Sequence, residues 1–243
     1  MAVSALTSSE LLAIWERGDG QRPSRRALAL LAGTAPHATP DELAAMPVGR
    51  RDASLVELRA RLFGDAFTGV TSCPACSESI ELTFGIDEVR REPAPHAPLS
   101  IREGPYSVEL RVPTTADLAA IERETELDSA RRALFARCVA RATRGDDSIG
   151  ADELPADVEE AAITAMANAD PQADVMLPVD CPGCEQTWLE PFDIVSFLWA
   201  ELSVLARRLL ADVHTLAAAY GWSESDILSL SPARRNAYLE MLA

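Results

Sequence analysis

The sequence predicts an α+β fold that is mostly helical and carries two β-hairpins, each with a Cys-Pro-x-Cys turn. Apolar residues recur at helical spacing through most of the chain, and Ser or Thr residues stand where these helices would begin. Around the two turns the pattern changes to the alternation of polar and apolar residues that is typical of strands. The expected order is helices, cysteine hairpin, hairpin, helices, cysteine hairpin, helices, which favours an α+β architecture.

Capping and terminating residues locate the predicted helices. In the N-terminal part, helices are expected around Leu11–Trp15, over 25–35, after Thr39-Pro40 and over 48–63. The later helices are expected over 116 to about 144 with a break near 125–128, over 156–169, over 193–220, and after Ser223 and Ser231.

Alternating segments locate the predicted strands, which comprise 79–84, 99–101, 106–112, 175–179 and 187–192. Gly104-Pro105 predicts a hairpin turn, whereas the proline-rich stretch 92–98 and the polar stretch 144–155 predict irregular connections. The chain therefore divides into five segments: an N-terminal helical region (1–66), a first cysteine hairpin (67–92), a hairpin with a helical insert (99–170), a second cysteine hairpin (174–193), and a long C-terminal helix with a helical cap (194–243).

The two cysteine turns are copies of one longer motif. Each Cys-Pro-x-Cys is followed by seven residues and then by Phe-x-Ile, and the two copies are offset by 108 residues. Two thiolates at this spacing can bind one face of a zinc ion, and two such pairs complete a tetrahedral four-sulfur shell. We therefore expect one structural Zn²⁺ in a split zinc-ribbon-like unit of two zinc knuckles. Its predicted ligands are Cys73, Cys76, Cys181 and Cys184.

Other interpretations of the four cysteines stay open. A Cys-Pro-x-Cys pair also occurs in thiol oxidoreductases, where it stands at a helix N-terminus, but strand-like residues follow both pairs in this chain. The cysteines could also be small apolar core residues, and two separate metal sites are an alternative to one shared ion. A closed four-cysteine shell leaves no open coordination position, so the metal would stabilise the fold without catalysing a reaction.

The charge of the chain is strongly negative and unevenly distributed. The net charge is −16, and all 22 basic residues are Arg. Residues 146–193 contain 13 Asp or Glu and no basic residue, and the second cysteine turn lies among them. Such a surface repels phosphate backbones, so we expect no nucleic-acid partner. It favours a basic protein partner or simple solubility.

No motif indicates secretion, a membrane span or catalysis. The N-terminus lacks the charged and apolar regions of a signal peptide, and no apolar run reaches the ~18 residues of a spanning helix. We therefore expect a cytoplasmic protein with reduced thiols. The sequence contains no phosphate-binding loop, nucleophile elbow or histidine-rich metal motif, so we expect no catalytic residues and a non-enzymatic role.

The C-terminal residues carry a resemblance to a known family. The segment from His214 through Tyr220-Gly221-Trp222-Ser223 to Pro232, followed by Arg234–Leu239, is similar to the tail of the T-even-type phage baseplate hub assembly chaperones. Leu11–Gly18 and Gly49–Ala53 resemble a longer form of that family, found in gene clusters for phage-tail-like contractile injection systems. The likeness to the longer form covers nearly the whole chain and includes both cysteine pairs.

The resemblance implies a role in the baseplate of a contractile particle. It implies either help in assembling the hub or spike or a minor structural place in the baseplate, with the hub or spike proteins as partners. The particle could retain the protein, and the oligomeric state stays open. Two further hypotheses come from the cysteines alone: a zinc-ribbon adaptor in transcription or other nucleic-acid work, and a CxxC thiol oxidoreductase.

Overall fold

The computed structural model describes residues 6–35, 37–91 and 99–242, which form two compact units. One unit combines Met1–Ala38 with Val195–Ala243, and the other comprises Thr39–Ile194. The five segments predicted from the sequence divide the chain more finely and stay predictions. The connector expected over 92–98, and the N-terminal residues 1–5 that bear on secretion, lie outside the described residues.

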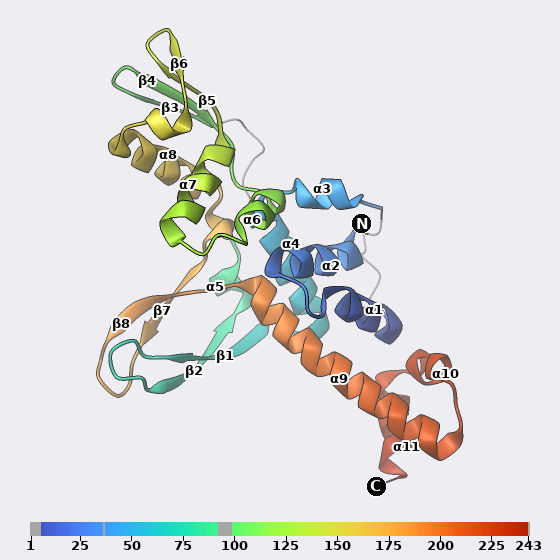
Figure 1. The fold of residues 1–243 in the computed structure, drawn as a ribbon. Coiled ribbons are helices and arrows are strands. Elements are labelled where there is room, and N and C mark those ends of the chain that lie inside the picture. Colours follow the sequence, from blue (N-terminus) through green and yellow to red (C-terminus); the bar gives the residue numbers. More distant parts are fainter. Residues whose placement is uncertain (1–5, 36, 92–98, 243) are drawn as a thin grey trace. The chain divides into compact units, whose positions relative to one another are not determined.

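The first unit is helical. Its elements are α1 (Ser8–Gly18), α2 (Pro23–Thr34), α9 (Ile194–Tyr220, beginning at the boundary), α10 (Glu224–Ser229) and α11 (Pro232–Glu240) (Figure 1). Thr7 and Ser223 close capping boxes at the starts of α1 and α10, as expected for Ser and Thr at these positions. Gly221 follows α9 with φ +68°, a left-handed conformation that glycine adopts without strain.

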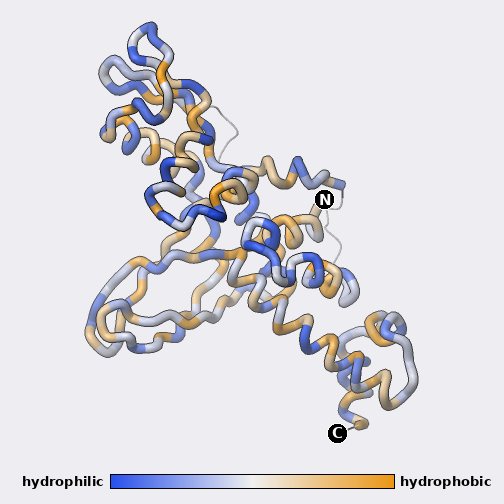
Figure 2. The backbone as a smooth tube through the Cα atoms, viewed as in Figure 1, coloured by the Kyte–Doolittle hydropathy of each residue, from blue (hydrophilic) through white to orange (hydrophobic). Residues whose placement is uncertain are grey.

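The long helix α9 buries its apolar stripe within this unit. Hydrophobic and hydrophilic residues recur along it (Figure 2), and Ala206 and Leu209 form a core cluster with Leu12 and Leu228. Trp199 is also buried, beneath the Arg26 guanidinium. This face of α9 therefore belongs to the core, whereas Val204, Leu210 and Tyr220 of the same helix are exposed. Among the described residues, no helix is long and apolar enough to cross a membrane.

The second unit mixes helices with three small antiparallel sheets of the described residues. Its helices are α3 (Pro40–Ala44), α4 (Val48–Phe63), α5 (Ile86–Val89), α6 (Thr115–Ile121), α7 (Leu127–Cys138) and α8 (Ala156–Ala169), with short 3₁₀ turns η1 (Ala151–Glu153) and η2 (Pro171–Ala173). Its strands are β1 (Ala66–Ser72), β2 (Ser79–Gly85), β3 (Leu99–Glu103), β4 (Tyr106–Leu110), β5 (Val139–Arg144), β6 (Asp147–Ile149), β7 (Met176–Asp180) and β8 (Thr187–Pro191).

The hairpin predicted over 99–112 is part of a larger sheet. Its order is β3-β4-β5-β6, and β5 pairs with β4 from Val139 to Arg144. The helix expected to continue to about 144 therefore ends at Cys138, and β6 and η1 occupy the expected loop. The free edge of β4 explains the difference, because its backbone groups need partners that a helix could not supply. The predicted break near 125–128 is confirmed, since α6 ends at Ile121 and α7 begins at Leu127.

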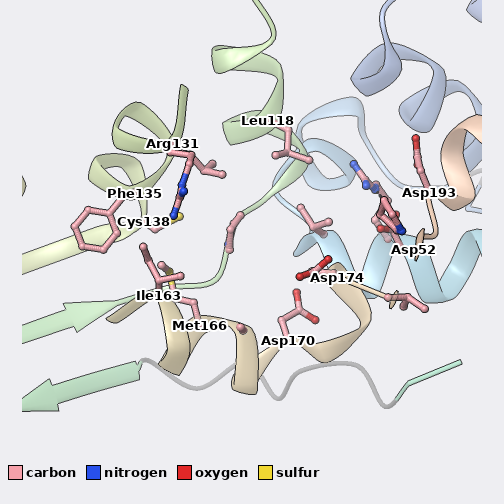
Figure 3. Close-up of a pocket in the computed structure, with 18 of the residues that line it drawn as sticks. Asp52, Leu118, Arg131, Phe135, Cys138, Ile163, Met166, Asp170, Asp174 and Asp193 are labelled. Carbon is pink, nitrogen blue, oxygen red and sulfur yellow. Dashed lines mark hydrogen bonds and ion pairs between the residues drawn. The ribbon is translucent and has the colours of Figure 1, made fainter. Parts of the chain in front are cut away.

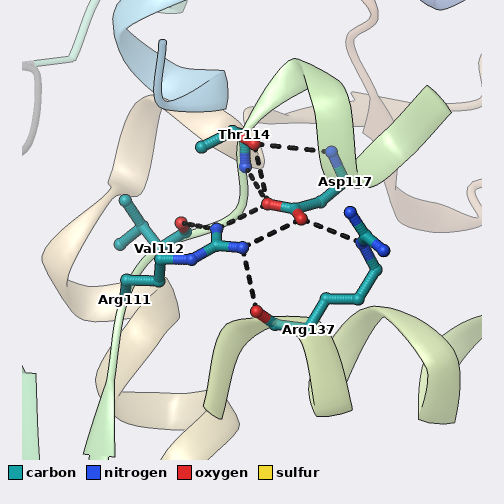
Figure 4. A network of polar contacts seen from close by, with 5 residues as sticks. All are labelled: Arg111, Val112, Thr114, Asp117 and Arg137. Carbon is teal, nitrogen blue, oxygen red and sulfur yellow. Dashed lines mark hydrogen bonds and ion pairs between the residues drawn. The ribbon is translucent and has the colours of Figure 1, made fainter. Parts of the chain in front are cut away.

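A buried carboxylate ties α6 to β4 and α7. Both terminal guanidinium nitrogens of Arg111 donate to Asp117, and Arg137 Nε donates to Asp117 Oδ1 at 2.9 Å (Figure 4). The backbone N–H and hydroxyl of Thr114 also donate to this carboxylate. Burial would raise the pKa of Asp117, but the hydrogen bonds from Arg111 and Thr114 outweigh it and hold the pKa well below its ordinary value. The network fixes the polypeptide where it leaves the sheet.

Candidate metal centre

The two cysteine turns have the same backbone geometry. In the first, Cys73 N–H donates to Glu78 O at 2.9 Å, and Ser77 N–H donates back to Cys73 O at 2.9 Å. The equivalent bonds in the second turn join Cys181 to Gln186 and Glu185, at 2.9 and 3.0 Å.

The residue after each pair adopts the same unusual conformation. Ser77 has φ 61° and Glu185 has φ 60°, so both lie in the left-handed region that non-glycine residues rarely adopt. The internal repeat seen in the sequence is therefore a repeat of structure, with each turn at the tip of a two-stranded hairpin, β1–β2 or β7–β8.

The tips of the two hairpins bring the four thiols together. All four Sγ atoms lie within 4.8 Å of one another. The Cys73–Cys184 and Cys76–Cys181 Sγ pairs, which join the hairpins, are each 3.6 Å apart. In each turn the first cysteine is buried and the second is exposed. Bonds of ~2.3 Å from zinc to sulfur place the sulfurs of a tetrahedron about 3.8 Å apart. The arrangement therefore fits a four-coordinate thiophilic metal ion.

The thiols also perturb one another's ionisation. Burial would raise the pKa of Cys73, but the backbone N–H groups of Cys76 and Ala75 outweigh it and lower the pKa to about 7. The backbone of Glu78 would lower the pKa of Cys76, but the Cys184 and Cys181 thiols raise it to about 12. Four thiolates this close would repel one another, and the positive charge of a bound dication would offset that repulsion and so favour the ionised form.

Two further contacts join the hairpins away from the cysteines. Glu190 on β8 accepts hydrogen bonds from Thr71 Oγ1 on β1 at 3.0 Å and from Trp188 Nε1 at 2.9 Å. The repeat residues Phe84 and Phe192 also meet, with ring centroids 5.4 Å apart, and both contact Phe67. The repeat in the sequence contains both phenylalanines but does not predict their contact, and Thr71 and Glu190 belong to no repeated motif that could have indicated them.

The surroundings of the cysteines differ from those of a redox dithiol. Each Cys-Pro-x-Cys lies in a turn between antiparallel strands, whereas a redox dithiol stands at a helix N-terminus, where the dipole activates the thiol. The sequence-predicted ligands Cys73, Cys76, Cys181 and Cys184 are those that the fold brings together. The fifth cysteine, Cys138, lies apart in the core beneath the four-stranded sheet. Among the described residues, these four cysteines could hold a metal ion.

Comparison with known protein families gives a match. The family model described as T4 bacteriophage base plate protein matches residues 30–199, more than two thirds of the chain. The matched residues include both cysteine turns and stop within α9, so the C-terminal segment from His214 onward lies outside them. No curated protein and no solved structure gives a significant match. The chain belongs to the T4 bacteriophage base plate protein family.

Proposed function

We propose that this protein is a non-enzymatic baseplate protein, or a hub or spike assembly chaperone, of a contractile phage-tail-like injection system. The observation that carries the proposal is the family match over residues 30–199, which spans the cysteine centre. The resemblance of His214–Leu239 to hub assembly chaperones adds the finer role. The protein would act in the bacterial cytoplasm, where such particles assemble, and the finished particle could retain it.

The cysteine centre would stabilise the fold by binding one structural Zn²⁺. Bound zinc would cross-link two hairpins whose cysteines are more than a hundred residues apart in the chain. Such cross-links hold together segments that have little apolar core of their own. The buried cluster at the cysteine end of the hairpins is small, with Ile80 and Val179 packed against the buried cysteines Cys73 and Cys181.

The helical cap that follows α9 would supply the docking surface. Tyr220 and Trp222 stack with ring centroids 4.7 Å apart, and Tyr238 packs edge-on against Trp222 at 4.8 Å. The Arg234 guanidinium lies over the Tyr238 ring. Tyr220 is 37% exposed and Met241 is 72% exposed. Tyr, Trp and Arg are the residues that most often dominate protein–protein binding energy.

Co-expression with the hub and spike proteins of the same gene cluster tests the proposal. We expect a hub or spike protein to co-purify with the wild type, and a deletion strain to form few complete particles. Trp222→Ala should abolish co-purification, whereas Leu127→Ala, an exposed apolar residue in the other unit, should leave it unchanged. No co-purification together with normal particles in the deletion strain would refute the role. If the protein does co-purify, mass spectrometry of purified particles distinguishes the two roles. A baseplate component would be present in the finished particle, and an assembly chaperone would be absent from it.

The two alternative functions make different predictions. A zinc-ribbon adaptor would bind labelled DNA and shift its mobility in a salt-sensitive way. The acidic stretch 146–193 disfavours such binding, because it repels phosphate groups. A thiol oxidoreductase would reduce insulin and would contain less than stoichiometric zinc. Stoichiometric zinc with neither activity would exclude both.

A further inference from the structure

The unit Thr39–Ile194 contains a cavity that the proposed zinc centre does not use. Its volume is about 510 Å³, within the range of ligand-binding pockets. The start of α4, the helices α7 and α8, and the segments flanking the second cysteine hairpin contribute its walls. None of the four clustered cysteines lines it. Figure 3 shows Asp52, Asp170, Asp174 and Asp193 on one side of it, and Phe135, Cys138, Ile163 and Met166 on the other, together with Arg131.

One side of the cavity is mostly apolar, and Arg131 is its charged member. Ile163 and Met166 of α8 lie there with Phe135 of α7 (Figure 3), and Leu134 of α7 also lines the cavity. Leu134 and Ile163 are only half-buried, although both pack against the core beneath the four-stranded sheet. An apolar side chain placed here would cover them and gain about 25 cal/mol for each Å² removed from water.

The opposite side of the cavity is acidic. Asp52, Asp170, Asp174 and Asp193 lie there (Figure 3), and Arg51 forms an ion pair with Asp52 at 2.6 Å. Asp170 Oδ2 accepts a hydrogen bond from Gly49 N–H at 2.9 Å. Asp174 is exposed and forms no ion pair with any described residue. Asp174 therefore presents a solvent-exposed carboxylate at the cavity, and this group would attract a cation.

The raised pKa of Asp52 also indicates that the acidic side of the cavity would attract a cation. Burial, with smaller contributions from the Asp193 and Asp170 charges, raises the pKa of Asp52 to about 6 against the opposing effect of Arg51. The ionised carboxylate is therefore incompletely stabilised by its surroundings. A guanidinium or ammonium group entering this side would stabilise it, because an opposite charge within a few ångströms favours the charged form.

We propose that this cavity binds a segment of a partner protein in which an aliphatic side chain lies close to an arginine or lysine. The aliphatic group would occupy the side formed by α7 and α8, and the basic group would pair with the aspartates. A nucleic acid or an acidic peptide would be repelled by the same carboxylates. A bare metal ion would leave the apolar side uncovered. The inference does not depend on which baseplate component the protein contacts.

A random twelve-residue peptide library displayed on phage tests this site. Selection against the wild-type protein should enrich peptides that combine Leu, Ile or Met with Arg or Lys. Fluorescein-labelled copies of these peptides, measured by anisotropy, should bind Asp174→Arg at least tenfold more weakly. Ile163→Gln should weaken binding similarly, and Asp128→Arg, an exposed charge reversal outside the cavity, should not.

Each other outcome would overturn the inference. These outcomes are no enrichment above background, enriched peptides without a basic residue, or enriched peptides whose binding both cavity variants leave unchanged. Circular dichroism and thermal unfolding check that the variants fold. Asp174→Arg decides the result if Ile163→Gln fails to fold, because Asp174 is exposed and a charge change there leaves the core intact.

Discussion

The rings of Phe84 and Phe192 meet edge to face, with centroids 5.4 Å apart, although 108 residues separate them in the chain. They occupy the same position in the two copies of the C-P-x-C-x7-F-x-I repeat. The copies therefore contact each other at two levels, through the cysteines at the hairpin tips and through these phenylalanines at the opposite ends of the hairpins. The Thr71–Glu190 hydrogen bond lies between the two levels.

Removing one cysteine from either turn should abolish metal binding. Cys73→Ser and Cys181→Ser should each reduce bound zinc from one ion per chain to near zero and lower the unfolding temperature, because one ion needs both pairs. Atomic emission spectroscopy of the dialysed protein measures the zinc. Cys138→Ala is the matched control and should keep full zinc, since Cys138 lies in another core cluster. If either serine variant kept a full equivalent, a single shared site would be wrong.

Removing the ring of Phe84 should destabilise the second unit. Phe84→Ala should lower the free energy of unfolding by about 3 kcal/mol, because it leaves a cavity against Phe67 and Phe192. Phe84→Leu fills most of that space and should cost about 1 kcal/mol. Urea unfolding in the presence of zinc gives both values. Equal losses for the two variants would show that ring packing does not stabilise the junction.

Neutralising Asp117 should destabilise the protein and change its acid sensitivity. Asp117→Asn should cost about 2–4 kcal/mol at pH 7, because Arg111 and Arg137 lose a buried partner. Since the pKa of Asp117 is lowered in the fold, its contribution is complete above its ordinary pKa of ~3.9 and is lost as pH falls below that value.

Urea unfolding at a series of pH values checks the effect of Asp117. Below about pH 4 the wild type should lose stability more steeply than Asp117→Asn, so the two curves should converge. Asp128→Asn, an exposed acid on α7, should stay within about 0.5 kcal/mol of the wild type at pH 7. Parallel curves for wild type and Asp117→Asn would contradict the assigned role.

Breaking the Arg235–Asp212 ion pair should destabilise the helical unit. Arg235 Nε lies 3.0 Å from Asp212 Oδ2, and both side chains are nearly buried, so Arg235→Met leaves an uncompensated carboxylate and should cost about 3 kcal/mol. The neighbouring Arg234→Met should cost less than about 1 kcal/mol, because Arg234 is exposed. Thermal unfolding followed by circular dichroism compares them. The double variant Arg235→Met/Asp212→Leu should recover most of the loss, and failure to recover would contradict the ion-pair explanation.

The sequence predicts the features whose causes are local. Thr7, Thr39, Thr114 and Ser223 begin the helices expected at those positions, since a side-chain oxygen satisfies backbone N–H groups within one turn. The helices expected over 48–63 and 193–220 end before Gly64 and Gly221. Both glycines have positive φ, a conformation that ends a helix and that glycine adopts without strain. The spacing of the four cysteines also predicts that they could share one metal ion, because two thiolates that bind the same ion are usually separated by only a few residues.

Tertiary structure decided what depends on partners distant in the chain. Val139–Arg144 continues a helical pattern but forms β5, because the edge of β4 offers it backbone hydrogen bonds that outweigh its local preference. The Phe84–Phe192 contact, the Thr71–Glu190 bond and the two-sided cavity likewise join residues from separate segments. The sequence thus determined where the helices begin and which thiols could share a metal. Only the folded chain determined which strands pair and which side chains surround the cavity. The energies of strand pairing and side-chain packing depend on distances in space, which the spacing of residues along the chain does not determine.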